Sequence, residues 1–520
     1  MKMIKKPKNV FFKIVFSRTM ITILLILFQI FMLFAMFQKL GEYSTFAMTA
    51  LNVSGSLCLL YLINKDDIAE FKLAWAIPIC AFPVLGAVLF WFVDQNFGSR
   101  EVKRQIGRRQ EESKNCIYTS EITKQMLKQI PLRDQAFFFY LENVGGHPTY
   151  AGGKATYFPW GKNKWEDLLG ELEKAKEFIF LEYFIIERGE MWDAVLKILK
   201  RKAAEGVEVR VMYDGMCSIL MLPHKYPKMM RRYGIKTQMF APILPLLSTH
   251  QNNRDHRKIL VIDGKVAYNG GVNLADEYIG KKIRFGTWKD TAVKIEGNAV
   301  DSFTVMFLQM WNSGKVGKVQ EYDKYLHRNM EKNETEQEKG FIVPYADGPH
   351  QKENLAEKVY MDILSTAERY VHIMTPYFIV DNEMLDTLKY AARRGVDVKI
   401  ILPHIPDKKV AFAIARNYYP TLLKHGIKVY EYTPGFMHAK VFTSDDKKAV
   451  VGSINLDYRS LYHHFECATY FYENSVIADV ERDFQKTLEQ CREVDMAYYK
   501  KIPALSRLLG WVVKLFGPLM

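Results

Sequence analysis

The chain contains one three-residue pattern twice: a histidine, a lysine two positions later and an aspartate seven positions later. The two copies are His256, Lys258, Asp263 and His438, Lys440, Asp445. In both copies a glycine and an asparagine follow the histidine after fourteen and seventeen positions. One short motif carries a risk of a chance match, but a second copy with the same flanking residues is far rarer. We therefore interpret the two segments as one functional unit built twice.

Two histidines of this kind can divide the steps of phosphoryl transfer between them. One imidazole nitrogen can attack phosphorus and form a covalent phosphoryl intermediate. A second, protonated imidazole can donate a proton to the departing alkoxide and then deprotonate the incoming alcohol. The sequence thus predicts a phosphodiester site to which each copy contributes one histidine.

Phosphoryl transfer places negative charge on the non-bridging oxygens, so the site needs preorganised donors around them. Each copy offers a lysine ammonium group, an asparagine amide and a small residue that lets the backbone approach the phosphate. These residues are Lys258, Lys440, Asn273, Asn455, Gly271 and Ser453. With such donors no metal is required, and the sequence shows no carboxylate cluster suited to Mg²⁺. We expect neither a metal site nor a cofactor.

Each histidine also needs an acceptor that orients its other ring nitrogen. Glu466, in the segment HHFE, is the candidate partner of His438, and Asp290, in WKD, is the candidate partner of His256. The alternative for both carboxylates is a surface charge. The two motif aspartates belong to the catalytic pattern, but they precede turn-like segments. We expect them to anchor strand ends more than to act in the chemistry.

The similarity between the two halves extends upstream of the motifs. LEYFII at 181–186 resembles TPYFIV at 375–380, and AAEGVEVRVMYD resembles ARRGVDVKIILP. Strands that alternate with helices indicate an α/β layered architecture in each half. Alternation along each motif strand places its histidine and lysine on one face. That face is expected to be the one the two halves share.

Composition changes along the 520 residues divide the chain into six segments. They are a membrane region at 1–95, a basic juxtamembrane linker at 96–149, a first repeat at 150–313, a polar linker at 314–340, a second repeat at 341–495 and an amphipathic tail at 496–520. The tail has leucines at helical spacing with interspersed lysines and arginines. Such a helix can lie in the headgroup plane of a membrane or pack on the protein's own core.

Three apolar runs near the N-terminus predict two to three transmembrane helices. Residues 20–37 carry no charge and match the hydrocarbon thickness of a bilayer, whereas 46–63 is weaker and 73–93 contains two prolines. The first run is too long for a signal peptide and lacks a good cleavage site. Both flanks of the three runs are basic, and three spans would place them on opposite sides. Either the N-terminus lies outside, or one run does not span.

The net charge of +14 and the pI near 9.1 favour anionic partners, such as nucleic acid or an anionic lipid surface. The six cysteines are scattered without metal-binding spacing. They indicate neither a zinc site nor a disulfide framework.

The doubled pattern with its downstream glycine and asparagine resembles the HKD motif of the phospholipase D superfamily. Bacterial cardiolipin synthases have segments similar to four of this chain: the apolar N-terminal runs, GGVNLADEY, GSINLDYRS and the apolar C-terminus. The resemblance implies two α/β/α sandwich domains packed pseudo-symmetrically, preceded by transmembrane helices. It further implies that His256 forms the phosphohistidine and His438 acts as the acid, although the sequence is symmetric in this respect.

The implied reaction transfers a phosphatidyl group between two phosphatidylglycerol molecules and yields cardiolipin and glycerol. The implied location is the bacterial plasma membrane, with the catalytic domains on its cytoplasmic face. One alternative is a phospholipase that resolves the intermediate with water. A membrane-tethered nuclease is a second, but we find no nucleic-acid module and expect no nucleic-acid partner. A lipid-binding scaffold is disfavoured because both motifs are intact, and the oligomeric state is left open.

Overall fold

The structure is a computed structural model of the 520-residue chain. It describes residues 31, 45–94, 99–217, 221–223, 225–241, 253–314, 319, 321–326, 339–349, 351 and 353–519. By internal contacts the chain divides into an N-terminal unit, which ends near Glu101, and a larger unit that holds both motifs.

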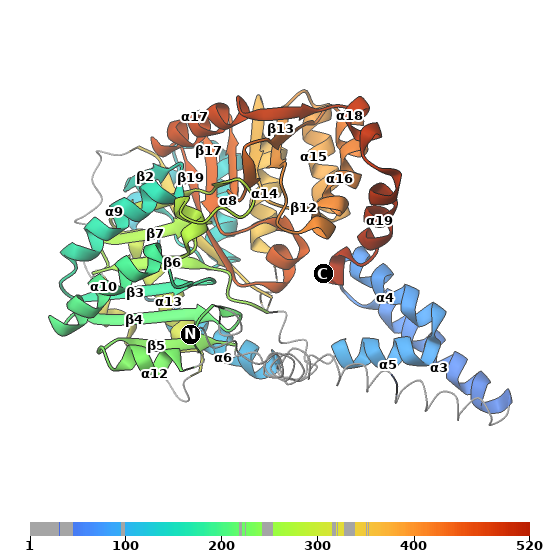
Figure 1. The fold of residues 1–520 in the computed structure, drawn as a ribbon, viewed down its shortest axis with the longest axis horizontal. Helices are drawn as coiled ribbons and strands as arrows, with labels where there is room; N and C mark the ends of the chain where they lie inside the picture. Colours follow the sequence, from blue (N-terminus) through green and yellow to red (C-terminus); the bar gives the residue numbers. More distant parts are fainter. Residues whose placement is uncertain are drawn as a thin grey trace, which may run out of the picture. The chain divides into compact units, whose positions relative to one another are not determined.

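The first repeat forms a seven-stranded mixed sheet (Figure 1). Its strands are β2 (Lys154–Phe158), β3 (Phe178–Tyr183), β4 (Glu208–Asp214), β5 (Lys236–Phe240), β6 (Lys258–Ile262), β7 (Val266–Gly270) and β9 (Ala292–Glu296). Its helices are α9 (Gly161–Lys174), α10 (Glu190–Ala204), α12 (Tyr226–Arg231) and α13 (Val300–Trp311). The order is β2-β9-β7-β6-β3-β4-β5, with β3, β4 and β5 parallel. Alternate residues of β3 enter two hydrophobic clusters, one with α9 and α10 and one with α13, as the period of a strand requires.

The second repeat has the same strand order within a nine-stranded sheet. Its strands are β10 (Phe341–Asp347), β11 (Tyr370–Met374), β13 (Asp397–Pro403), β14 (Lys428–Tyr432), β16 (Val441–Ser444), β17 (Lys448–Gly452), β19 (Glu466–Tyr472) and β20 (Cys491–Val494). Its helices are α14 (Leu355–Thr366), α15 (Asn382–Arg393), α16 (Lys409–Lys424) and α17 (Val476–Leu488). β11, β13 and β14 are parallel, and β16 is antiparallel to β11. The expected mixed α/β architecture with two similar domains is therefore confirmed.

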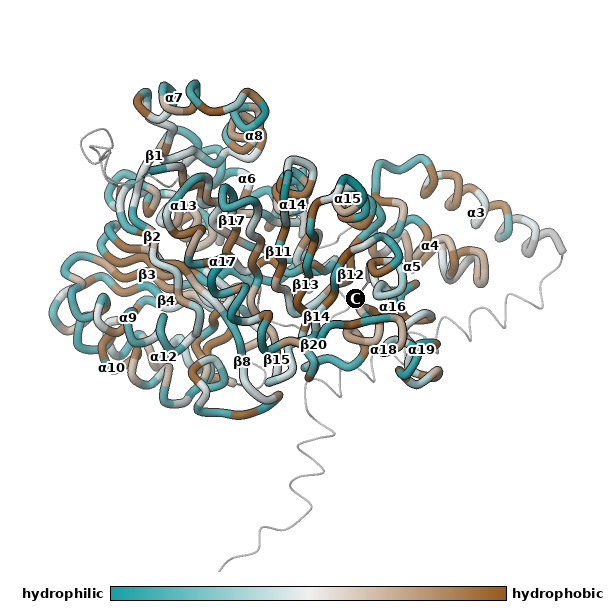
Figure 2. Tube along the Cα trace, turned by 90° about the horizontal axis from the view of Figure 1, so that it is seen from above, coloured by the Kyte–Doolittle hydropathy of each residue, from teal (hydrophilic) through white to brown (hydrophobic). Residues whose placement is uncertain are grey.

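A common hydrophobic core joins the two sheets. The cluster contains Phe307 of α13 and Ile259 of β6 together with Val451 of β17 and Phe484 of α17. Figure 2 shows that β3, β11 and β13 are largely hydrophobic. Burial of this apolar surface is the main force that holds the two repeats together.

The segment expected to be a juxtamembrane linker is folded onto the two repeats: its last two helices lie on the second sheet, whereas its first helix contacts α13 and the segment that follows α13. It contains α6 (Ser99–Ser113), α7 (Glu121–Leu127) and α8 (Leu132–Asn143). Phe138 of α8 packs against Phe341 and Tyr472, and the short strand β1 (Tyr150–Ala151) pairs with β10. The expectation of a simple linker is wrong because aromatic residues of α8 supply part of the core of the second repeat.

The N-terminal unit contains α3 (Thr45–Asn64), α4 (Ala69–Ala81) and α5 (Pro83–Asp94). The third apolar run is divided between α4 and α5 at Phe82, because Pro83 cannot donate the backbone hydrogen bond that would continue the helix. Across the described residues, no helix is both long and apolar enough to cross a membrane. The second and third runs lie within the described residues, whereas the first run, 20–37, lies outside them apart from residue 31.

The C-terminal tail forms α18 (Met496–Lys501) and α19 (Ala504–Lys514). One face of α19 packs on α16, where Gly510 lies so close to the carbonyl group of Ala413 that a Cβ atom would come within 2.4 Å of its oxygen. The remaining surface of α19 exposes large apolar side chains, Leu505 and Trp511 among them. The tail therefore combines both expected features, core packing on one side and an apolar face on the other.

Two short contacts connect the repeats at the motifs. β8 (Thr287–Lys289) pairs in parallel with β15 (Gly435–Met437), and Asp255 forms an isolated bridge with Phe465. Near the first contact, Lys289 of the first repeat forms a buried ion pair with Asp483 of the second, with Nζ–Oδ1 and Nζ–Oδ2 distances of 2.7 and 2.8 Å. Each repeat thus reaches into the other directly beside a motif histidine.

We expect Asp483→Ala to lower the free energy of unfolding by about 3–5 kcal/mol, because it leaves the buried Lys289 ammonium group without its counter-ion. Urea unfolding of the purified protein measures this loss. The double variant Lys289→Met, Asp483→Leu is the control, since it removes both charges together and should recover most of the stability. A single variant as stable as the wild type would refute the structural importance of this pair.

Candidate active site at the junction of the two repeats

The two motif histidines precede equivalent strands and are both buried. His256 comes just before β6, and its backbone N–H donates to the carbonyl oxygen of Phe465 at 2.9 Å. His438 follows β15, and its N–H donates to the carbonyl oxygen of Lys289 at 2.7 Å. Each histidine is therefore held by the backbone of the opposite repeat, which brings both to the junction.

The orienting carboxylates are exchanged between the repeats. His256 Nδ1 lies 2.8 Å from Glu466 Oε1, and His438 Nδ1 lies 2.6 Å from Asp290 Oδ2. Both carboxylates are fully buried. A hydrogen bond from Nδ1–H to a carboxylate leaves Nε2 of each ring available for chemistry.

This geometry corrects the pairing expected from the sequence, in which Asp290 served His256 and Glu466 served His438. Both carboxylates were identified, but each belongs to the other histidine. The reason is tertiary: β8 runs beside β15, and Phe465 runs beside Asp255. Each carboxylate-bearing segment consequently lies next to the histidine of the opposite repeat.

The motif lysines lie in the same buried space. Lys258 and Lys440 are almost fully buried, and each Nζ donates to the carbonyl oxygen of the histidine two residues earlier. Burial lowers the pKa of Lys258 to about 7 and that of Lys440 to about 8, while Glu466 and Asp290 oppose this effect. The charged form of each side chain is therefore poorly compensated inside the protein, and a bound anion would stabilise it.

Burial also disfavours charge on the two histidines. It lowers the pKa of His438 to about 4, with Lys440 adding repulsion and Asp290 opposing it. The pKa of His256 lies well below its usual value for the same reason, with Lys258 as the next cause. Burial raises the pKa of Glu466 to about 8, and Lys258 counteracts this rise. In the unliganded protein both imidazoles are neutral at neutral pH.

The motif aspartates anchor the sheets. Asp263 accepts backbone hydrogen bonds from residues 176–178, the start of β3, each at 2.8 Å. Asp445 accepts the equivalent three from residues 368–370, at 2.7 to 2.9 Å. Both aspartates have positive φ angles, of 51° and 56°. Both aspartates therefore anchor strand ends, as expected, while their grouping with the catalytic residues stays a prediction.

Two of the predicted phosphate-binding residues support the carboxylates. Ser453 Oγ donates a short hydrogen bond to Glu466, so it holds the partner of His256. Gly271 lies against Asp290, where a Cβ atom would come within 2.1 Å of the carboxylate oxygen. The small size of Gly271 therefore gives Asp290 the space it needs to reach His438.

The two predicted asparagines are both buried at the junction. Asn273 donates from Nδ2 to the hydroxyl group of Tyr278 at 2.7 Å, and its Oδ1 accepts from the N–H of Ile185. Asn455 Oδ1 has no hydrogen-bond partner among the described residues. Contact between these amides and a phosphate stays a prediction.

His464 is a site residue that the sequence reasoning missed. Its ring centroid lies 5.5 Å from that of His256, and neither ring nitrogen has a hydrogen-bond partner within the described part of the chain. Together with His256 and Glu466 it forms a group that could hold a metal ion, with ligand atoms within 4.8 Å of one another. In the sequence, the only indication of this role was that His464 lies two positions before Glu466 in HHFE.

Comparison with known proteins also finds relatives with phospholipase D-like domains. A family model described as "Cardiolipin synthase, PLD-like domain" matches residues 168–311 and 360–488. The chain is 50% identical over 462 residues to an uncharacterized protein of Streptococcus mutans, which covers 89% of this chain and 99% of that relative. It is 33% identical over 453 residues to a cardiolipin synthase of Alkalihalophilus pseudofirmus, covering 86% of this chain and 88% of the relative.

Among solved structures, the phosphatidylserine synthase of Haemophilus influenzae is similar with a TM-score of 0.55. It covers 73% of this chain and 96% of its own, at 15% sequence identity. This likeness concerns the fold alone.

The charge state of the site predicts proton-linked anion binding. A bound phosphodiester anion stabilises protonated Lys440, so binding should take up protons where the free side chain is partly neutral, near pH 8. Dimethyl phosphate stays a monoanion over this pH range. We expect its affinity to rise as pH falls from about 9 to about 7, by at most roughly tenfold per pH unit for each proton taken up. Isothermal titration calorimetry in buffers of different ionisation enthalpy measures the uptake, and Lys440→Met should reduce it. Affinity independent of pH would contradict this charge state.

The anchoring aspartates give a second expectation. Asp263→Ala should lower the free energy of unfolding by about 2–4 kcal/mol, because three backbone N–H groups lose a charged acceptor. Activity per folded molecule should change little. Asp263→Asn, which keeps one acceptor oxygen and tolerates positive φ, is the milder control. A stable but inactive Asp263→Ala variant would show that Asp263 takes part in catalysis.

Proposed function

This chain belongs to the cardiolipin synthase family of phosphatidyltransferases with phospholipase D-like domains, and we propose that it joins two phosphatidylglycerol molecules into cardiolipin with release of glycerol. The observation that carries the proposal is the exchange of Glu466 and Asp290 between the repeats. It places two oriented histidines and two lysines in one buried site, and these are the groups that a two-step phosphodiester exchange needs.

In the first step, His256 Nε2 attacks the phosphorus of one phosphatidylglycerol. The nitrogen–phosphorus bond forms while the bond to the headgroup glycerol oxygen breaks, and the electron pair of that bond stays on the oxygen. His438 donates a proton to this oxygen, and glycerol leaves. The negative phosphodiester beside His438 favours the imidazolium form that this step needs, against the burial that disfavours it in the free protein.

In the second step, the terminal headgroup hydroxyl of another phosphatidylglycerol attacks the phosphorus. His438 accepts the hydroxyl proton, the new oxygen–phosphorus bond forms, and the bond to His256 breaks. One phosphodiester replaces another, so the exchange requires no nucleotide. Lys258 and Lys440 compensate the charge on the non-bridging oxygens in both steps.

We assign the nucleophile to His256 because Ser453 fixes its partner Glu466, and because the rings of Tyr278 and Trp288, which line a pocket, lie beside His438. Each predicted repeat, at 150–313 and at 341–495, supplies one histidine and one carboxylate. The proposed site therefore depends on both repeats.

We also propose that the enzyme works at the cytoplasmic face of the bacterial plasma membrane. Residues 20–37 would supply the anchor, and the exposed apolar side chains of α19 would contact lipid. The net charge of +14 would attract anionic headgroups. A phospholipase that hydrolyses the intermediate remains the rival function, since it uses the same site.

Products separate the two functions. Purified protein incubated with phosphatidylglycerol vesicles should yield cardiolipin and glycerol, as resolved by lipid chromatography and mass spectrometry. His438→Ala should reduce the rate by about 10²–10⁴-fold, the usual contribution of a general acid and base, and His256→Ala should lose at least as much. His425→Ala, at the end of α16, is the control and should retain activity.

Accumulation of phosphatidate without cardiolipin would replace the synthase proposal with the hydrolase. Unchanged activity in either catalytic variant would refute a site shared by the two histidines.

A further inference from the structure

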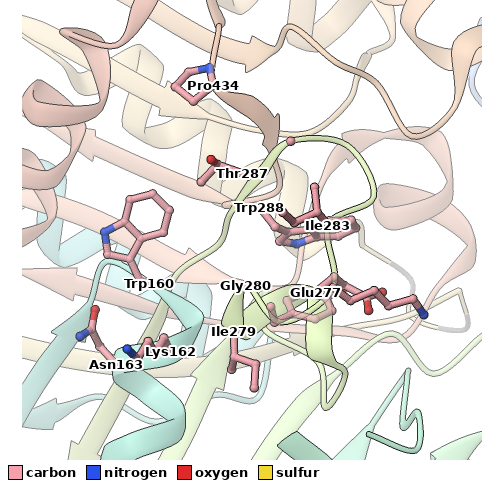
Figure 3. A pocket seen from close by; sticks show the side chains of 13 residues that line it. Trp160, Lys162, Asn163, Glu277, Ile279, Gly280, Ile283, Thr287, Trp288 and Pro434 are labelled. Atoms are coloured by element: carbon pink, nitrogen blue, oxygen red, sulfur yellow. The ribbon is translucent and has the colours of Figure 1, made fainter. Parts of the chain in front are cut away.

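A pocket of about 540 Å³ borders the general acid (Figure 3). Its lining comes from the start of α9, from the segment 277–288 and from Pro434 of the second repeat. This volume falls within the usual range of small-molecule sites, roughly 300–1,000 Å³, whereas one water molecule occupies only about 30 Å³. The pocket is thus much larger than a path for water would need to be.

Two aromatic side chains form a wall common to the pocket and the catalytic site. The ring centroid of Trp288 lies 5.3 Å from that of His438, and the ring of Tyr278 lies 5.7 Å from it. The same Tyr278 hydroxyl accepts the hydrogen bond of Asn273. A molecule in the pocket is therefore separated from the imidazole of His438 by one aromatic ring, that of Trp288 or Tyr278.

The chemistry of exchange determines which substrate can use this position. The alcohol that leaves and the alcohol that replaces it are protonated and deprotonated by the same imidazole. Both must therefore occupy the side of the phosphorus that faces His438. The lipid tail of the donor stays attached to phosphorus and needs a different path.

The lining combines apolar surface with exposed polar side chains. Trp160 and Ile283 present apolar surface, and Ile283 is 82% exposed. Asn163 and Thr287 are exposed polar residues of the same lining. Their side chains can hydrogen-bond to a polar headgroup.

We propose that this pocket binds the acceptor lipid, with its glycerol headgroup at the inner end beside Trp288 and Thr287 and its apolar glycerol-ester region at the outer end against Ile283. A vicinal diol suits the inner end, because its hydroxyls can donate to or accept from the Thr287 hydroxyl. The outer end gives a lipid alcohol an advantage that water and free glycerol lack. The pocket would thereby favour transfer over hydrolysis, and this inference rests on the proposed function.

The test compares two acceptors in the same phosphatidylglycerol vesicles. One assay measures cardiolipin formation, and the other measures incorporation of radiolabelled free glycerol into phosphatidylglycerol. Both begin with the same attack by His256, but only cardiolipin formation needs the outer end of the pocket. Ile283→Asp should lower cardiolipin formation by about tenfold or more, through lost apolar contact and repulsion of the anionic lipid. Glycerol incorporation should stay within about twofold.

Leu132→Asp is the matched control, because Leu132 is also 82% exposed but lies on α8. It should leave both reactions near the wild-type rates. Trp288→Ala removes the ring that lies beside His438 at the inner end and should slow both reactions to a similar extent.

Equal loss of both reactions in Ile283→Asp, or no loss in either, would overturn the acceptor pocket. A wild-type protein that incorporates glycerol but forms no cardiolipin would instead overturn the proposed function. The two failures are therefore distinguishable.

Discussion

The exchange of carboxylates between the repeats is the interaction on which the rest of the site depends. Glu466 orients His256 and Asp290 orients His438, and all four side chains are buried where the repeats meet. Neither repeat supplies both members of either of these two pairs. The parallel pairing of β8 with β15 and the bridge from Asp255 to Phe465 are therefore requirements of the chemistry as well as of the fold.

Burial gives this arrangement its electrostatic character. Two lysines and two histidines lie in one desolvated space, and burial is the largest cause of the lowered pKa of each. Two buried carboxylates compensate this set only in part. A bound phosphodiester anion would supply the missing negative charge, and in the proposed mechanism it would favour protonation of His438, the histidine that acts as the acid. Substrate binding and activation of the acid are thus parts of one electrostatic event.

The sequence predicted the catalytic pattern and the α/β repeats because both leave local signals, namely the motif spacing and the alternation of strands with helices. It also identified Asp290 and Glu466, but it assigned each to the wrong histidine, since the pairing is decided by strands from opposite repeats. His464 and the pocket at Trp288 left almost no signal, because residues distant in sequence meet there only after folding. The anchoring aspartates were recognised from the turns that follow them. The prediction of a single helix for the third apolar run was wrong, because Pro83 divides that run into two helices.

The most direct test of the exchanged pairs is ¹⁵N NMR of the protein labelled only at histidine, with the resonances of His256 and His438 assigned from their single variants. The account predicts that Asp290→Asn shifts the Nδ1 resonance of His438 and leaves that of His256 in place, and that Glu466→Gln does the reverse. A shift of the His256 resonance in Asp290→Asn, with His438 unchanged, would contradict the shared site.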